Sequence, residues 1–470
     1  MADRSVGDLA IVLHSHMPYV EGYGTYPFGE EWLFEAWARS HLPVLEVAQH
    51  VTMTVTPVLA DQLEADGVGE RMRAFLAKHR VEAGDRDVAD RGIELRPAAE
   101  SEVKRYAAAM KRLERLGMKP LRIFQEAHEK GRIALIPSAA THAVLPKLAT
   151  TGGRRLQIDA GLRSHARRFG DSEGFWLPEC AYVPGLEALM AERGIAFTCL
   201  DQSPNERGTT ALAPIRLPGG PTGFTIDWPT VRLVWSEGGY PSDPAYMEYH
   251  RLSPNGMRLW TIAGTPYDAS AAGKRASEHA ASFLAAVRDR LERHRKERGG
   301  PGLCVFAIDT ELLGHWWAEG PVWLREVLRG ARLERIRLLT LPQALREHPG
   351  EERAALRGSW GEGKSLETWD SPSVSDLVWA TRRSELTFLR ALGTGRLTGN
   401  GARRAARELL ALQSSDWAFM DHRGQAGDYP YTRATLHAEA LLEAIDSPDT
   451  VDARVRNLAP DLSLAPLLEP

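Results

Sequence analysis

Two acidic side chains follow short apolar runs, a pattern that suits nucleophilic and acid–base chemistry. Glu179 follows the run 174–177, and Asp309 follows the run 303–308. A pair of carboxylates can cleave a glycosidic bond, because one attacks the anomeric carbon while the other protonates the leaving oxygen. Each acid could instead cap a helix or form a salt bridge. The tryptophans near both acids favour sugar chemistry, since a flat aromatic face packs well on a sugar ring.

Two histidines follow another apolar run. His14 and His16 come directly after residues 9–13, and side chains two apart on a strand face the same way. With His142 or Asp309 as a further ligand, they could hold a metal ion. They could also bond the hydroxyl groups of a sugar, or be core histidines with satisfied hydrogen bonds. The residues alone leave these three interpretations open.

The apolar runs alternate with helical patterns, which is typical of a parallel α/β fold. Because the carboxyl ends of parallel strands converge on one rim, we expect the acids and histidines to lie there together. The expected strands are 9–13, 52–59, 133–136, 174–177, 195–200, 303–308 and 336–339. The expected helices are 31–39, 154–169, 186–193, 270–296 and 323–329, with a charged helical stretch at 61–130. The Pro- and Gly-rich segment 203–264 is predicted to be a functional loop region.

Beyond residue 341 the strand signals stop, and the patterns at 375–392, 401–413 and 432–445 are helical. We therefore predict two domains. A barrel-like catalytic α/β domain would span 1–350, with a helical insertion near 61–130. An α-helical domain would span 351–470.

The composition argues against several classes of partner. A net charge of -4 over 470 residues provides no basic surface for nucleic acid. No run of about 18 apolar residues is present, so we expect no membrane span. The N-terminus lacks the features of a signal peptide, and the three cysteines are not at metal-ligand spacing. We expect a cytoplasmic protein with reduced thiols.

Five stretches resemble, in the same order, the five signature regions of glycoside hydrolase family 57. They are 14–19, 140–146, 175–182, 309–317 and 414–419. Within that family the likeness is closest to the 1,4-α-glucan branching enzymes. The resemblance implies an incomplete (β/α)7 barrel followed by an α-helical C-terminal domain. It also implies an α-glucan substrate, such as amylose or a glycogen-like polymer, and no metal or organic cofactor.

The resemblance further implies a retaining mechanism, with Glu179 as nucleophile and Asp309 as general acid/base. The enzyme would cleave an α-1,4 linkage and pass the chain to a 6-hydroxyl, forming an α-1,6 branch. Substrate contacts carried over from the family are His14, His16, His142, Trp260, Trp317, Trp360, Trp369, Asp416 and Trp417.

A lid loop near 234–243 is the feature that the resemblance ties to transfer. It would carry Tyr240 over the active site and exclude water, so that a sugar hydroxyl takes the bound chain. Ser242 stands where glycine is usual in the family, which predicts a lid that sits or moves differently.

Other activities remain as alternatives. An α-amylase or 4-α-glucanotransferase of the same family would differ only in what accepts the chain. A glycan-binding protein with weak catalysis and a metal-dependent deacetylase are more distant hypotheses. We expect a monomer.

Overall fold

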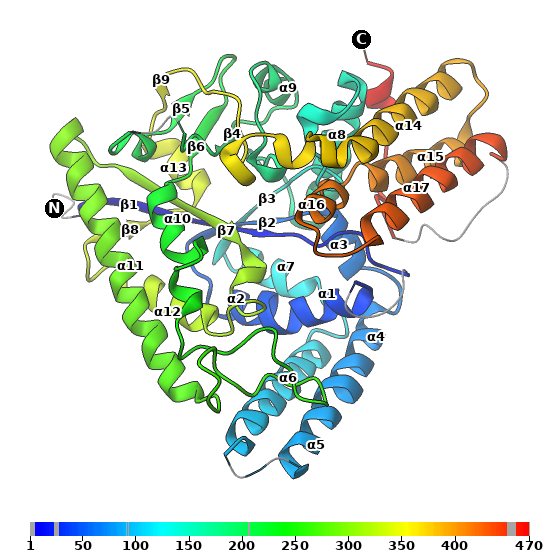
Figure 1. The fold of residues 1–470 in the computed structure, drawn as a ribbon. Helices are drawn as coiled ribbons and strands as arrows, with labels where there is room; N and C mark the ends of the chain where they lie inside the picture. The colour runs from blue at the N-terminus through cyan, green and yellow to red at the C-terminus, as the bar shows by residue number, and fades with distance from the viewer. Residues whose placement is uncertain are drawn as a thin grey trace.

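Two sheets of mostly parallel strands lie at the centre of the molecule (Figure 1). Isolated parallel bridges between them complete a ring. The computed structural model describes residues 5–22, 28–90, 92, 94–204, 207–448 and 457–469. In ring order the segments are β1 (Gly7–Ser15), β2 (Val51–Val55), β3 (Ile133–Ile136), residues 174–176, β4 (Phe197–Leu200), β6 (Thr222–Thr225) and β7 (Leu303–Asp309), which pairs back to β1. This arrangement confirms the predicted incomplete (β/α)7 barrel.

Next to Glu179, one of the predicted acids, isolated bridges replace a regular strand of the ring. The segment 174–176 makes isolated bridges where the sequence predicts a strand at 174–177. The Trp176 N–H donates to the carbonyl of Pro137 at 2.7 Å, and the Phe175 N–H donates to the carbonyl of Phe197 at 3.0 Å. Few backbone hydrogen bonds therefore hold this wall of the barrel.

One predicted strand is too long. The expected strand 52–59 ends at Val55, and α3 (Pro57–Leu63) begins directly after it. Proline has a fixed φ that suits the first helical position, where its missing N–H costs nothing. Because the run is rich in β-branched residues, its sequence pattern did not indicate that a helix begins at Pro57.

The prediction of a loop region at 203–264 is only partly correct. It contains α10 (Trp228–Trp235) and two short strands, β5 (Ile215–Arg216) and β6. The carboxylate of Asp227 caps α10 by accepting the Thr230 N–H at 3.3 Å. Such a cap stabilises a short helix that composition alone does not indicate.

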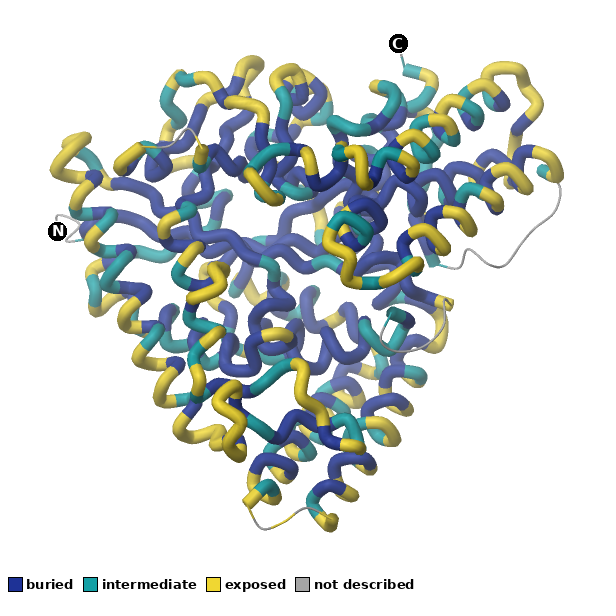
Figure 2. The backbone as a smooth tube through the Cα atoms, viewed as in Figure 1, coloured by how far each residue is buried: buried dark blue, intermediate teal, exposed yellow. Residues whose placement is uncertain are grey.

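Helices surround the ring and fill the predicted insertion. Those in the first half are α1 (Glu30–Ala36), α2 (Leu42–Val47), α3, α4 (Val68–Phe75), α5 (Glu82–Asp90), α6 (Arg96–Arg115), α7 (Arg122–Glu129), α8 (Thr151–Phe169) and α9 (Leu186–Glu192). Later ones are α10, α11 (Ala269–Arg298), α12 (Gly320–Gly330) and α13 (Leu341–Glu347). The short strands β8 (Ile336–Leu338) and β9 (Glu351–Glu352) pair with β1 and β5. Figure 2 shows the buried segments concentrated in and around the ring.

The C-terminal part is helical, as predicted, and its helices lie beside one end of the barrel (Figure 1). They are α14 (Ser375–Gly393), α15 (Gly399–Leu412), α16 (Ser415–Arg423) and α17 (Tyr429–Asp446). A bridge between Ala143 and Ser414 ties this part to the loop after β3. Among the described residues, no helix is long and apolar enough to cross a membrane.

Candidate active site

Glu179 lies on a tight turn just beyond the segment 174–176. Its backbone is left-handed, with φ 61° and ψ 17°, and Cys180 has a φ of 49°. Such φ values are uncommon for residues other than glycine and are typical of functional positions. The turn gives Glu179 a backbone conformation that a regular strand or helix does not provide.

Two donors hold the Glu179 carboxylate. The indole Nε1–H of Trp360 donates to Oε2, and the hydroxyl of Ser415 donates to Oε1, both at 2.9 Å. Burial raises the pKa of Glu179 to about 7, while the hydrogen bonds from Trp360 and Ser415 act in the opposite direction. The site thus holds a carboxyl group that ionises near neutral pH.

Asp309 ends β7 and pairs in register with His14 of β1. Burial, together with the charges of Glu311 and Glu179, raises its pKa well above the ordinary range. A carboxyl kept protonated beside an ionisable carboxylate fits a general acid next to a nucleophile. The charge of Glu179 contributes to this rise of the Asp309 pKa, and the meeting of the two acids at one rim stays a prediction.

A row of stacked rings lines the site beside Glu179. His16 stacks on His142 at 4.2 Å between ring centroids, His142 on His14 at 4.7 Å, and His14 on Trp176 at 4.8 Å. Burial lowers the pKa of His14 and of His142 well below the ordinary value, so both are neutral. Each has a buried Nε2 without a hydrogen-bond partner among the described residues. Their bonding to a substrate hydroxyl stays a prediction.

The C-terminal helical part supplies side chains to this rim. His16 Nε2 lies 3.0 Å from the Asp416 carboxylate at the start of α16. Burial opposes a charge on His16, but Asp416 overcomes it and raises the histidine pKa. Ser415 from the same helix turn bonds Glu179, so the two parts of the chain share one site.

The comparisons with known proteins identify this arrangement. The model of glycosyl hydrolase family 57 matches residues 10–357. The chain belongs to this family. A second family model, described as the C-terminal part of 1,4-alpha-glucan branching enzymes, matches residues 380–459.

Individual proteins that are similar to this family 57 chain bear the branching-enzyme name. It is 31% identical to a 1,4-alpha-glucan branching enzyme of Thermococcus kodakarensis, over 92% of this chain and 72% of the relative. A probable branching enzyme of Mycobacterium tuberculosis is also 31% identical, over 93% and 91%. The crystal structure of the family 57 branching enzyme from Pyrococcus horikoshii has a TM-score of 0.91 at 30% identity, covering 98% of this chain and 97% of that one.

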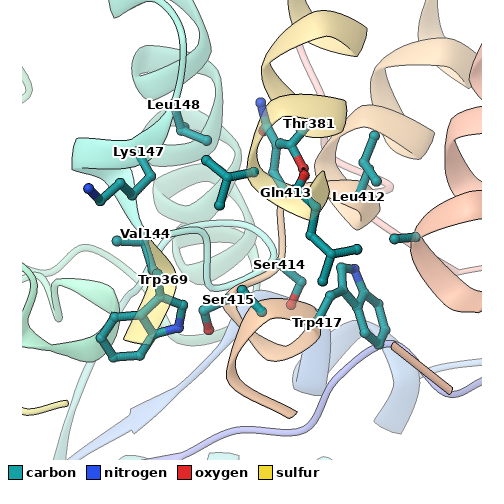
Figure 3. Close-up of a pocket in the computed structure, with 14 residues that line it drawn as sticks. Val144, Lys147, Leu148, Trp369, Thr381, Leu412, Gln413, Ser414, Ser415 and Trp417 are labelled. Carbon is teal, nitrogen blue, oxygen red and sulfur yellow. Dashed lines mark hydrogen bonds between the residues drawn. The ribbon is translucent and has the colours of Figure 1, made fainter. Parts of the chain in front are cut away.

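The tryptophans that were expected to bind substrate in this family 57 chain have different surroundings. Trp360 meets Trp176 edge to face at 5.0 Å and bonds Glu179, so it lies within the site. Trp369 and Trp417 are buried, and Figure 3 shows them in the wall of a pocket with Ser415 between them. Both side chains line this pocket together with Ser415.

The two remaining tryptophans contact other side chains, and their role toward substrate stays a prediction. Trp317 is 1% exposed and packs between Tyr246 and Trp323 in the main core. Trp260 is half-buried under Arg251, whose guanidinium lies 4.1 Å from the ring centroid.

Tyr240 lies on a 3₁₀ turn, Tyr240–Ser242, that rests on α11. Its ring stacks on His279 at 4.5 Å, and its hydroxyl donates to Ser282 at 3.1 Å. The hydroxyl of Ser242 donates to the carbonyl of Gly239 at 2.7 Å, and its φ is not positive. Serine is thus accommodated at this position without backbone strain.

Two residues of the site were missed from the sequence, although both lie within the signature stretches. Ser415 joins Glu179 to His142, with its hydroxyl 2.9 Å from the His142 Nδ1. Glu311 accepts the His16 N–H at 3.1 Å and contacts His41 at 2.6 Å. The sequence signal is their position: Ser415 adjoins Asp416, and Glu311 lies two residues after Asp309.

The Ser415 hydroxyl is expected to set the pH dependence of the site. Because it donates to Glu179, it can accept from His142 only when Nδ1 of that ring carries a proton. Removing the donor in Ser415→Ala destabilises the carboxylate and raises the Glu179 pKa further. The acidic limb of the pH profile of kcat/KM should move up by about one pH unit.

Ser415→Thr is the matched control, since it keeps the hydroxyl and should restore the limb. A profile measured from pH 5 to 9 separates this effect from damage to the fold, which would lower activity at every pH. An acidic limb left in place in Ser415→Ala would contradict the role of the hydroxyl.

Proposed function

We propose that this protein is a retaining 1,4-α-glucan branching enzyme. The observation that carries the proposal is the shared site: Glu179 of the barrel takes one of its two side-chain hydrogen bonds from Ser415, which begins the helix α16. That helix lies inside the region matched by the branching-enzyme C-terminal model. Relatives at about 30% identity over most of the chain bear the branching-enzyme name.

In the first step Glu179 bonds to the anomeric carbon of an α-1,4-linked glucose while the glycosidic bond breaks. The proton on Asp309 passes to the leaving oxygen, and the donor chain remains as an ester on Glu179. His14 and His142, with their unpartnered Nε2 atoms, would bond hydroxyl groups of the reacting sugar. The neutral state of both rings suits such bonds.

In the second step Asp309 takes the proton from an acceptor 6-hydroxyl, whose oxygen bonds to the anomeric carbon as the ester breaks. The charge on Glu179 helps to raise the Asp309 pKa. Ester formation removes that charge, so the Asp309 pKa falls during the intermediate. The same carboxyl can then act as base, as the change from cleavage to transfer requires.

The direct test is the product from linear amylose. A new α-1,6 anomeric signal in the proton NMR spectrum, with few new reducing ends, is the expected result. Many reducing ends without an α-1,6 signal would indicate an α-amylase, and altered α-1,4 chain lengths alone a 4-α-glucanotransferase. Tight amylose binding without any product would indicate a glycan-binding protein.

Tyr240 is proposed to exclude water from the glycosyl ester. Replacement by alanine should shift the outcome toward hydrolysis, raising the ratio of new reducing ends to α-1,6 linkages several-fold. Tyr240→Phe keeps the ring that stacks on His279 and is the matched control. An unchanged ratio in Tyr240→Ala would contradict the lid argument.

We also propose a monomer that acts on α-glucan in the cytoplasm. The three cysteines, Cys180, Cys199 and Cys304, are unpaired and buried, which fits a reducing compartment. Light scattering on the purified protein tests the monomer directly.

A further inference from the structure

Two tryptophans lie together on the surface. Trp235 is 43% exposed and Trp316 is 37% exposed, and their rings meet edge to face with centroids 6.4 Å apart. Single exposed apolar residues are ordinary, but a contiguous aromatic surface is typical of a binding site. The pair contributes nothing to the chemistry described above.

The pair brings together the end of α10 and the segment that follows Asp309. Trp235 is the last residue of α10, directly before the turn that carries Tyr240. Trp316 belongs to the segment that begins at Asp309, and its N–H donates to the carbonyl of Glu311 at 3.3 Å. Trp235 therefore lies just before the proposed lid turn, and Trp316 lies on the loop that follows the proposed general acid.

Adjacent tryptophans on the Asp309 segment have opposite environments. Trp317 is packed in the core, so its ring faces are covered by protein. Trp316 keeps more than a third of its surface in contact with solvent. Of the two, only Trp316 can stack on a sugar without a rearrangement of the core.

We propose that Trp235 and Trp316 form a stacking platform for an α-1,4-glucan chain on the leaving-group side of the cleft. This inference rests on the proposed function. A general acid must lie beside the glycosidic oxygen that it protonates, so the Asp309 segment borders the departing chain. The acceptor chain enters on the same side once that chain has left.

The geometry of the pair fits a curved polysaccharide. The ring planes lie at 74° to each other, so their faces point in different directions. An α-1,4-linked chain winds, and successive sugar faces turn along it. Two rings at this angle can therefore stack on two different glucose units of one chain.

Binding is best measured without turnover. In a Glu179→Gln background, amylose in a native gel should retard the protein, and adding Trp316→Ala or Trp235→Ala should weaken this apparent affinity about tenfold. Trp379→Ala in the same background is the matched control, because Trp379 is 60% exposed on α14, away from this pair. Equal retardation of all four proteins would overturn the platform.

The leaving-group side is tested in the active enzyme. Trp316→Ala should increase the hydrolysed fraction at low amylose concentration, and saturating amylose should return it to the wild-type value, because only acceptor binding is weakened. An increase that persists at saturation would overturn an acceptor role and indicate water entry instead. If Trp316→Ala splits a dimer in light scattering while amylose retardation is unchanged, the pair contacts a second copy, and the proposal is wrong.

The proposed function and this inference fail separately. A wild-type protein that forms no α-1,6 linkages disproves branching, whatever the gel shows. A branching wild type whose tryptophan variants bind and transfer normally disproves the platform alone.

Discussion

Glu179→Gln is expected to abolish both cleavage and transfer, lowering kcat by at least about 10⁴-fold, as is typical when a covalent nucleophile is removed. An amide does not attack the anomeric carbon, so no glycosyl ester forms. The substitution should preserve the fold. A glutamine oxygen can still accept the Trp360 N–H, and its amide nitrogen can donate to the Ser415 hydroxyl.

The measurement is the rate of new reducing ends and of α-1,6 linkages from amylose, with the thermal midpoint Tm and amylose retardation as controls for folding and binding. Glu129→Gln provides a matched control, because Glu129 is exposed at the end of α7, outside the site. Substantial residual turnover in Glu179→Gln would disprove the nucleophile assignment and, with it, the proposed mechanism.

Asp309→Asn should slow the cleavage of amylose by about 10²–10⁴-fold, the usual contribution of a general acid. The reason is the raised pKa of Asp309, which keeps a proton available for the leaving oxygen. A donor with a leaving group that needs no proton, such as an α-maltosyl fluoride, should still glycosylate Glu179. The fluoride should therefore recover most of the lost rate of the first step.

This difference between substrates separates acid catalysis from a positioning role. Asp289→Asn on the exposed face of α11 is the control for a charge change alone, since that side chain is 64% exposed. If Asp309→Asn slowed amylose and the fluoride equally, Asp309 would not be the acid, and Glu311 would become the next candidate.

The barrel and its acids could be predicted because the evidence is local. A buried strand followed by a polar residue is visible in the sequence, and parallel strands bring such residues to one rim. The register that pairs His14 with Asp309 follows from that rule. The expected strand at 174–177 illustrates its limit, because isolated bridges, not a strand, precede Glu179.

What could not be predicted depends on contacts between distant segments. Trp316 and Trp317 are neighbours of the same type, and only packing against Tyr246 and Trp323 decides which one is buried. Likewise, no local pattern shows that the Tyr240 ring stacks on His279 of α11. The link between Ser415 and Glu179 spans 236 residues, which is beyond the reach of any periodicity.

The hydrogen bond between Ser415 and Glu179 also affects when the site is completed during synthesis on the ribosome. Glu179 is made before its hydroxyl donor and the partner of His16, which are residues 415 and 416. A nascent chain that has not reached α16 holds an incomplete cleft, with the carboxylate lacking one of its two donors. We therefore expect glucan cleavage to begin only after α16 has been made and has packed against the barrel.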